Sequence, residues 1–325
     1  MCQDTSVFNP LPDGLGSSSR ESTEPVRLRA VDSVEITIVV DNSIDYLLRG
    51  DKRASRASLS PGWTKKPQLR AEHGYSLLFT FQNNGASRTF LYDAGLTPET
   101  LIHNLGALGV SLTDLEAIVL SHGHVDHHGG LLGLVQKIGK RRLPLVLHPD
   151  AWRNRKVFLP FGIQFELPPP DRKALEKEDV QIIEEQGPSL LIGDEALVTG
   201  RVERVTDFEK GVQFQYAEQD GKWTEDPWIW DDQAIIFNLK GKGLVVASSC
   251  SHAGAVNILR SARKTTGVDK IHAFVGGLHL PVGFAENIPQ TMQELETIRP
   301  DVIVPGHCTG WKATHEIERR MPNAF

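Results

Sequence analysis

Four side chains that commonly bind metal, spaced His-x-His-x-Asp-His, lie between His122 and His127. They follow an apolar run, residues 116–120, that predicts a buried β-strand, and precede a periodic apolar run, residues 131–138, that predicts a helix. Imidazoles at one turn repel each other when protonated and need partners when buried, and a bound cation removes both difficulties. The spacing therefore predicts a metal site at a strand-to-helix turn and disfavours a run of surface histidines.

Three later histidines occupy the same kind of position. His252, His279 and His307 each follow a short apolar run that predicts a strand, and Cys250 lies two residues before the first of them. Side chains at the carboxyl ends of strands gather at the edge where layered α/β proteins place their sites. We therefore expect these imidazoles to lie near the 122–127 turn.

These motifs resemble the signature of the metallo-β-lactamase-fold superfamily. Within it they resemble the branch similar to the archaeal dihydropterin and ribofuranosylaminobenzene-phosphate synthase. Members of this branch are often described only as metal-dependent hydrolases. The resemblance covers roughly residues 34–312. Besides the run above, it rests on residues 71–78, 92–95, 231–234, 250–254, 276–280 and 305–310. It implies an α/β fold, the four-layer αββα sandwich, with two mixed sheets face to face and helices outside. Alternating strand and helix signals are consistent with that fold.

The resemblance also implies two divalent metal ions. Zinc is the expected metal, and manganese and iron are the alternatives. The ligands that it implies are His122, His124 and His252 for one ion and Asp126, His127 and His307 for the other. His252 is chosen because relatives take this third imidazole from a mid-chain loop, and here no histidine lies between His148 and His252. Many relatives also have a bridging aspartate at a strand end, where this chain has Ser249–Ser251. The bridge is then a water or hydroxide, or Cys250 acts as a soft ligand.

Further residues complete the predicted site. Asp93 is expected to support the metal loop, residues 121–127, because a carboxylate can orient ligand histidines. His279, outside both ligand sets, is predicted to contact the substrate or donate a proton, and Asp126 to orient the nucleophile. Asn42 is a candidate for a substrate or supporting contact. His73 is another, and a hydrogen-bonded loop histidine is an equal alternative for it.

The leading functional hypothesis is a metal-dependent hydrolase. A metal-bound hydroxide would attack an ester-type bond in a phosphodiester, phosphoester or lactone, because a metal lowers the pKa of water from near 16 toward about 7. The first alternative, implied by the resemblance, is a synthase-like enzyme that condenses a pterin with an aminobenzene ribofuranosyl phosphate. A mononuclear iron oxidase or dioxygenase and a non-catalytic, metal-stabilised binding module are the remaining alternatives.

The composition narrows the partners and the compartment. The 325 residues carry a net charge of -6 with a pI near 6.1, so no broad basic face for nucleic acid is expected. We find no stretch of transmembrane length and no signal-peptide pattern. Three scattered cysteines disfavour a disulfide framework. We expect a cytoplasmic protein that acts on a small molecule, with no nucleic-acid or membrane partner.

The chain is predicted to hold one domain, residues 33–325, behind an extension. Residues 1–32 carry Pro, Gly and Ser without a periodic apolar face, which predicts a flexible segment or an arm on a partner subunit. Residues 152–188 show little pattern and are a candidate lid. Trp223, Trp228 and Trp230 crowd one loop, which leaves a substrate-pocket wall, a homodimer contact or core packing open.

The apolar patterns predict most of the regular elements. Strands are expected at 34–40, 75–81, 89–92, 114–120, 143–147, 197–207, 212–217, 233–239, 243–248, 269–275 and 301–304. Helices are expected at 98–108, with Thr97 as N-cap, and at 131–139 and 253–265. Runs 197–207 and 212–217 should pair with each other, as should 233–239 and 243–248. The turn Asn83-Asn84-Gly85 predicts a hairpin.

Overall fold

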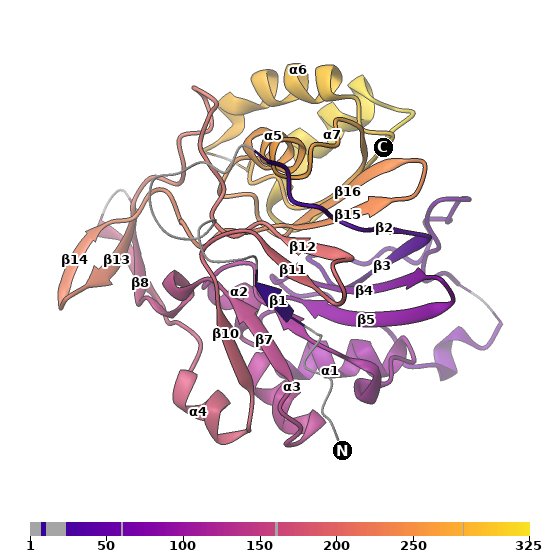
Figure 1. Cartoon of the computed structure of the whole chain (residues 1–325), viewed down its shortest axis with the longest axis horizontal. Helices are drawn as coiled ribbons and strands as arrows, with labels where there is room; N and C mark the ends of the chain where they lie inside the picture. The colour runs from indigo at the N-terminus through magenta and orange to yellow at the C-terminus, as the bar shows by residue number, and fades with distance from the viewer. Residues whose placement is uncertain (1–7, 11–23, 60, 160–161, 282) are drawn as a thin grey trace.

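Two β-sheets packed face to face form the centre of the molecule, and helices cover both outer faces (Figure 1). The computed structural model describes residues 8–10, 24–59, 61–159, 162–281 and 283–325. Aliphatic and aromatic side chains from both sheets fill the space between them, and a further cluster lies between each sheet and its helices. The predicted four-layer αββα sandwich is confirmed.

The first half of the chain builds most of a six-stranded sheet. Its order is β10 (Gln181–Glu184), β7 (Pro144–Leu147), β6 (Ile118–Val119), β5 (Ala86–Tyr92), β4 (Ser76–Asn83) and β3 (Ser33–Val40). Strands β3 to β5 are antiparallel, and β5, β6, β7 and β10 run parallel. Asn84 and Gly85, with φ of 50° and 81°, form the predicted hairpin turn, in which both central residues need positive φ.

The second sheet brings the later histidines to one edge. Its order is β1 (Phe8–Pro10), β11 (Ser189–Leu191), β12 (Ala196–Val198), β15 (Ile235–Leu239), β16 (Gly243–Ser248), β17 (Ile271–Gly276) and β18 (Val302–Pro305), with β2 (Ala30–Val31) beside β15. The predicted pairing of 233–239 with 243–248 is confirmed as β15 and β16. Strands β16, β17 and β18 run parallel, so the turns that carry His252, His279 and His307 follow neighbouring strand ends.

Helices form the two outer layers. Helices α1 (Pro98–Ala107) and α3 (Leu131–Ile138) cover the six-stranded sheet, and α5 (Ala255–Thr266), α6 (Ile288–Ile298) and α7 (Trp311–Arg320) cover the other. The shorter helices are α2 (Val125–His128), α4 (Arg172–Lys177) and the 3-10 turns Trp63–Lys65, Leu112–Asp114, Pro149–Trp152, Ala285–Asn287 and His307–Thr309. Thr97 caps α1 and Pro98 begins it, as predicted. No helix in the described ranges is long and apolar enough to cross a membrane.

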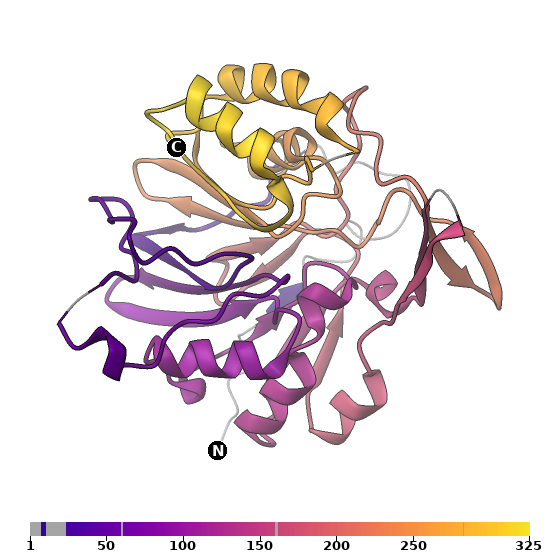
Figure 2. The same cartoon turned by 180° about the vertical axis from the view of Figure 1, so that it is seen from behind.

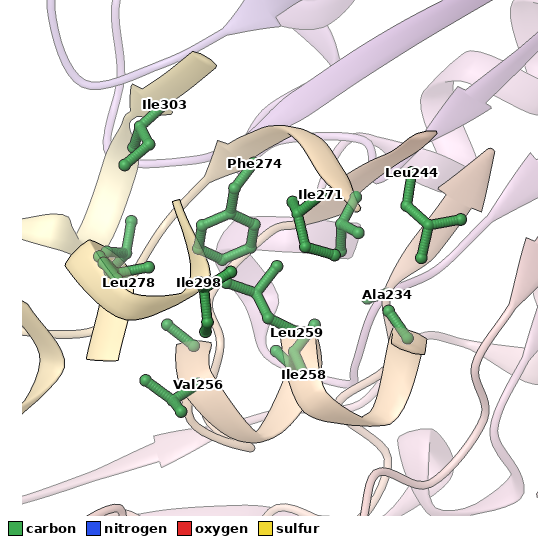
Figure 3. Close-up of a cluster of buried hydrophobic side chains, with 14 of the residues drawn as sticks. Ala234, Leu244, Val256, Ile258, Leu259, Ile271, Phe274, Leu278, Ile298 and Ile303 are labelled. Carbon is green, nitrogen blue, oxygen red and sulfur yellow. The ribbon is translucent and has the colours of Figure 1, made fainter. Parts of the chain in front are cut away.

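Helix α5 illustrates how an outer layer is fixed. Val256, Ile258 and Leu259 are fully buried in one cluster with Ile271 and Phe274 of β17 (Figure 3). Burying an aliphatic side chain of this size contributes roughly 1.5–3 kcal/mol. The apolar face therefore holds in place the helix that begins just after His252.

A four-stranded sheet, the small sheet, projects from the side of the sandwich (Figures 1 and 2). Its order is β14 (Lys222–Glu225), β13 (Gln215–Gln219), β8 (Arg155–Phe158) and β9 (Gln164–Leu167). The predicted pairing of 197–207 with 212–217 is therefore wrong, because β12 pairs with β11 and β15 while β13 pairs with β8 and β14. Strand β12 ends at Val198, and the chain turns away at Gly200, whose φ of 59° lies outside the range of a strand.

Part of the predicted flexible extension packs onto the sandwich instead. Val26 and Leu28 are buried, and β2 pairs with β15, so the segment from residue 24 onward belongs to the fold. These apolar side chains have no periodic pattern because they lie in an irregular segment. Strand β1 pairs with β11. Residues 1–7 and 11–23 lie outside the described residues, and a flexible extension stays a prediction for them.

Candidate metal centre

Six side chains from both sheets meet at one edge of the sandwich. The ligand atoms of His122, His124 and His252 all lie within 4.8 Å of one another. Those of Asp126, His127 and His307 form a second group within the same limit. The structure therefore brings together both predicted ligand sets, and their binding of metal stays a prediction.

The loop between β6 and α2 carries four of these six side chains. His124 is the N-cap residue of α2, so Asp126 and His127 lie in its single turn. A Cβ on Gly123 would lie 2.4 Å from the carbonyl oxygen of Ala151, so only glycine fits between the first two histidines. The Gly123 N–H donates a 2.7 Å hydrogen bond to Asp231 Oδ2, which fixes the turn.

Asp93 contacts this loop as a supporting carboxylate would. It is fully buried, accepts hydrogen bonds from the N–H and Oγ of Ser121 at 2.7 and 2.6 Å, and lies 2.8 Å from Nδ1 of His127. With Nδ1 bonded to Asp93, Nε2 of His127 is the atom left for an ion. Burial opposes the charged form of His127, but the carboxylates of Asp126 and Asp93 outweigh it and raise its pKa to about 9.

The first group has the chemistry of an imidazole-bound cation site. Nε2 of His122 and Nε2 of His252 lie 3.1 Å apart, close to the roughly 3.3 Å expected for two nitrogens on one tetrahedral zinc ion. Nε2 of His124 is buried without a hydrogen-bond partner among the described residues. Burial lowers the pKa of all three rings, that of His124 to about 3, so each holds a free lone pair at neutral pH. The residues present fit a divalent ion.

The second group adds a carboxylate. Oδ2 of Asp126 lies 3.6 Å from Nε2 of His127 and 3.3 Å from Nε2 of His307. Burial opposes ionisation of Asp126, but these two histidines lower its pKa, so it is a carboxylate at neutral pH. Asn42 holds His307 by donating from Nδ2 to its carbonyl oxygen at 3.0 Å, and Oδ1 of Asn42 lies 3.1 Å from Nδ1 of His307. These contacts favour a supporting role for Asn42, which stays a prediction.

The sequence profile of the metallo-beta-lactamase superfamily matches residues 71–256. The chain belongs to this superfamily. It is 30% identical to the 7,8-dihydropterin-6-methyl-4-(beta-D-ribofuranosyl)-aminobenzene-5'-phosphate synthase of Methanocaldococcus jannaschii over 293 residues, 88% of this chain and 94% of that protein. An uncharacterised protein of the same archaeon is 31% identical over 253 residues, 77% of this chain and 88% of that protein.

A solved structure supports the fold. The crystal structure of a metal-dependent hydrolase of the beta-lactamase superfamily aligns with a TM-score of 0.68 at 22% identity, over 89% of this chain and 93% of that one. At this identity the likeness concerns the fold alone. The expected resemblance to the superfamily, and to the branch of the archaeal synthase, is confirmed.

Two cysteines lie at the junction of the two groups. Sγ of Cys250 lies 3.5 Å from Nε2 of His127, and Cys250, His307 and Cys308 form a further compact group of ligand atoms. Burial raises the pKa of the Cys250 thiol. Burial also opposes ionisation of Cys308, but its contact with Cys250 and neighbouring His279 lower its pKa. Cys308 was not among the predicted site residues, although its position beside His307 was a signal.

The two remaining predicted histidines lie at the margins of the centre. The ring of His279 lies 4.3 Å from that of His252, and its Nδ1 is buried without a partner among the described residues. It belongs to neither predicted ligand set. His73 is exposed over 71% of its side chain, lies 3.6 Å from Oδ2 of Asp126 and stacks on the ring of His307. Both histidines therefore border the two predicted ligand groups, and His279 also forms a compact group of ligand atoms with Cys250 and His252.

A buried ion pair that the sequence analysis missed joins the small sheet to the metal loop. Arg155, at the start of β8, donates from Nη2 to Asp231 Oδ1 at 2.6 Å and from Nε to Asp226 Oδ2 at 3.2 Å. Burial opposes ionisation of Asp231, but Arg155 outweighs it and lowers the pKa of that carboxyl. Because Asp231 also holds Gly123, the position of the small sheet is coupled to that of the loop. Asp231 lay in a quoted motif, but its partner is distant in sequence.

A pocket of about 660 Å³ opens onto the candidate centre. At its metal end it is lined by His124, Asp126, His252, His279 and His307. Part of the segment predicted as a lid forms a wall, through Val157 of β8 and Phe165 and Leu167 of β9. The pocket can therefore hold a small molecule in contact with both ligand groups.

The tryptophan-rich loop does not line this pocket in the part of the chain that the structure describes. Trp223 lies in β14 with the Lys156 ammonium 3.9 Å from its ring centre. Trp228 and Trp230 stack on each other at 5.8 Å, and Arg201 covers Trp230. The three indoles thus pack in two separate places, so the predicted pocket-wall alternative is wrong, and a homodimer contact stays a prediction.

Proposed function

We propose that the protein is a metal-dependent hydrolase that holds two divalent ions and cleaves an ester-type bond of a small molecule. Zinc is the leading candidate for the metal. The observation that carries this proposal is the pair of adjacent three-ligand groups that border one pocket. Nε2 of His124 is buried there without a hydrogen-bond partner among the described residues, which is costly unless a ligand satisfies it. Membership of an enzymatic superfamily supports catalysis over a purely binding role.

The protein's own groups have distinct tasks in this reaction. Bound divalent ions would supply Lewis acidity and a lower pKa for water in the pocket. Asp126, a carboxylate between His127 and His307, accepts a hydrogen bond from the attacking water and so orients it. The oxygen of this water bonds to the carbonyl carbon of the ester while one of its protons is released to bulk water, the bond to the leaving oxygen breaks, and that oxygen takes up a proton. His279 lines the pocket and is the candidate donor of that proton.

A second candidate is a condensing enzyme like the archaeal synthase. Identity of 30% over 88% of this chain and 94% of the archaeal synthase favours it. The same two ligand groups would then activate one organic substrate toward another. The two candidates differ in one requirement, since a hydrolase turns over an ester with water alone and a synthase needs a second organic substrate.

The test is a screen of the metal-loaded protein over aryl esters, lactones, phosphomonoesters and phosphodiesters, each without a second organic substrate. We expect turnover of one ester class. We also expect His279→Gln to keep its metal and lose roughly a hundredfold or more in turnover. His315→Gln, an exposed histidine outside the pocket lining, is the matched control and should be unchanged. No hydrolysis of any ester by the metal-loaded protein would contradict the proposal and favour the synthase. One iron per chain with visible absorbance would favour an oxidase.

The compartment and partners remain part of the same proposal. The unpaired state of Cys250 and Cys308 supports a reducing compartment such as the cytoplasm. A net charge of -6 supports a small-molecule substrate over nucleic acid. Size-exclusion chromatography with light scattering would test the homodimer, and a monomer mass would remove it.

A further inference from the structure

One wall of the pocket, formed by the small sheet and the start of α7, is largely apolar and exposed, with Gln215 of β13 as an uncharged polar member. Phe165 of β9 and Trp311 at the start of α7 both line the pocket and are 46% and 76% exposed. Val157, Leu167 and Pro281 add aliphatic surface to the same lining. Exposed aromatic side chains gathered in a concave site are typical of a ligand surface, because covering them removes apolar area from water.

The pocket lining offers no side chain with a fixed positive charge. Among the described residues that line it, none is lysine or arginine. Its ionisable oxygen and nitrogen groups are the carboxylates of Asp41 and Asp126 and the imidazoles of His73, His124, His252, His279 and His307. An anionic group at the metal end would face cations. An anionic group beside Phe165 would lose water without gaining a cation or a guanidinium to pair with.

We propose, on the basis of the proposed hydrolase function, that the substrate is an ester or lactone whose portion remote from the reacting bond is uncharged and apolar. Phe165 is then a specificity-determining residue that covers this portion. The proposal selects among ester classes, because it disfavours substrates that carry a phosphate or carboxylate away from the bond that is cleaved. It also assigns a task to the small sheet, which reaches the metal loop through Arg155 and the substrate through β9.

A matched pair of esters tests this. We would compare 4-nitrophenyl hexanoate with the mono-4-nitrophenyl ester of adipic acid, which share the reacting bond and differ in charge at the far end. The metal-loaded protein should prefer the neutral ester by about tenfold or more in kcat/KM. Binding of the two non-hydrolysable anilides, hexananilide and adipic acid monoanilide, measured by calorimetry on the same protein, should show the same preference.

Two charge variants isolate the wall from the ions. Phe165→Lys should shift the preference toward the anionic ligand by about tenfold or more, because it places a cation on the apolar wall. Phe214→Lys is the control, since Phe214 lies on the same side of the molecule, is 53% exposed and is not in the pocket lining. It should leave the preference unchanged. Phe165→Ala, with circular dichroism to verify folding, should weaken the neutral ligand alone.

The outcomes separate this proposal from the proposed function. Preferential binding of the neutral anilide, reversed by Phe165→Lys, with no hydrolysis of either ester, supports the apolar ligand class while contradicting the hydrolase. Hydrolysis of both esters at equal rates, with equal binding of both anilides, overturns the apolar ligand class and leaves the hydrolase standing. Equal shifts in Phe165→Lys and Phe214→Lys also overturn it, because the effect would then be one of net charge.

Discussion

The two sheets build the candidate metal centre in different ways. The six-stranded sheet supplies four of the six ligands from one loop, and buried carboxylates, Asp93 and Asp231, hold that loop through backbone N–H groups. The eight-stranded sheet supplies His252 and His307 from two separate strand ends. Carboxylates bind backbone N–H groups here as well, Asp41 at His307 and Asp232 at Ala253, and the exposed Asn42 contacts the ring of His307. One half of the site is therefore a single local loop, and the other is assembled from distant strand ends.

The largest expected effect comes from removing a ligand of the loop between β6 and α2. His122 belongs to the first ligand group, and its ring lies 4.3 Å from that of His127 in the second. His122→Ala should lose bound metal together with turnover, which should fall to on the order of a thousandth or less, since a catalytic ion supplies several kcal/mol of stabilisation. Elemental analysis and ester assays on the same preparation measure both. Wild-type activity in this variant would end the assignment of His122.

A pair of supporting residues sharpens the comparison. Asp93→Asn replaces a buried carboxylate that binds both Ser121 and His127, so metal affinity should fall by roughly 10–100-fold. Asn42→Ala removes a partly buried contact to His307 and should cost less than tenfold. Competition with a coloured chelator measures both affinities. An equal or larger loss in Asn42→Ala would mean that the two halves are held equally tightly.

A smaller effect concerns stability in the second half. Asp232 is fully buried, accepts a hydrogen bond from the N–H of Ala253 at 2.8 Å, and burial raises its pKa to about 7. Between about pH 4 and pH 7 the folded protein keeps this proton while the unfolded chain has lost it. The contribution of this carboxyl to stability is therefore complete at low pH and is lost as pH rises through that window.

Asp232→Asn lacks this titration and supplies the test. Relative to wild type, the variant should gain stability from about pH 4 to about pH 7, by up to a few kcal/mol. Urea unfolding with chelator present in every sample measures the difference. A constant difference across this range would show that Asp232 is already ionised in the folded protein at low pH.

The comparison also explains what could be predicted from the sequence. The His122–His127 loop was recognisable because its ligands are close together in the chain and a glycine separates the first two. His252 and His307 could be assigned only through the resemblance to a known family, because their approach depends on the order of β16, β17 and β18. The sandwich itself was implied by the resemblance to the superfamily, and the alternating strand and helix patterns were consistent with it.

What could not be predicted rests on contacts between distant segments. Arg155 and Asp231 pair across the small sheet, and neither carries a local signal for the other. The small sheet was missed because of the partners of β13. One is β8, in the weakly patterned residues 152–188, and the other is β14, in the tryptophan-rich loop. Helices α6 and α7 were not predicted, and the packing of Val26 and Leu28 lacks any periodicity.

The most direct test of two adjacent metal sites is elemental analysis of wild type, His252→Ala and His307→Ala, purified in parallel. Each variant removes one ligand from one group, and three protein ligands are the usual minimum for a catalytic zinc ion. The account predicts about two ions per chain in wild type and about one in each variant. A wild-type protein with one ion or none, or two ions retained by both variants, would contradict it.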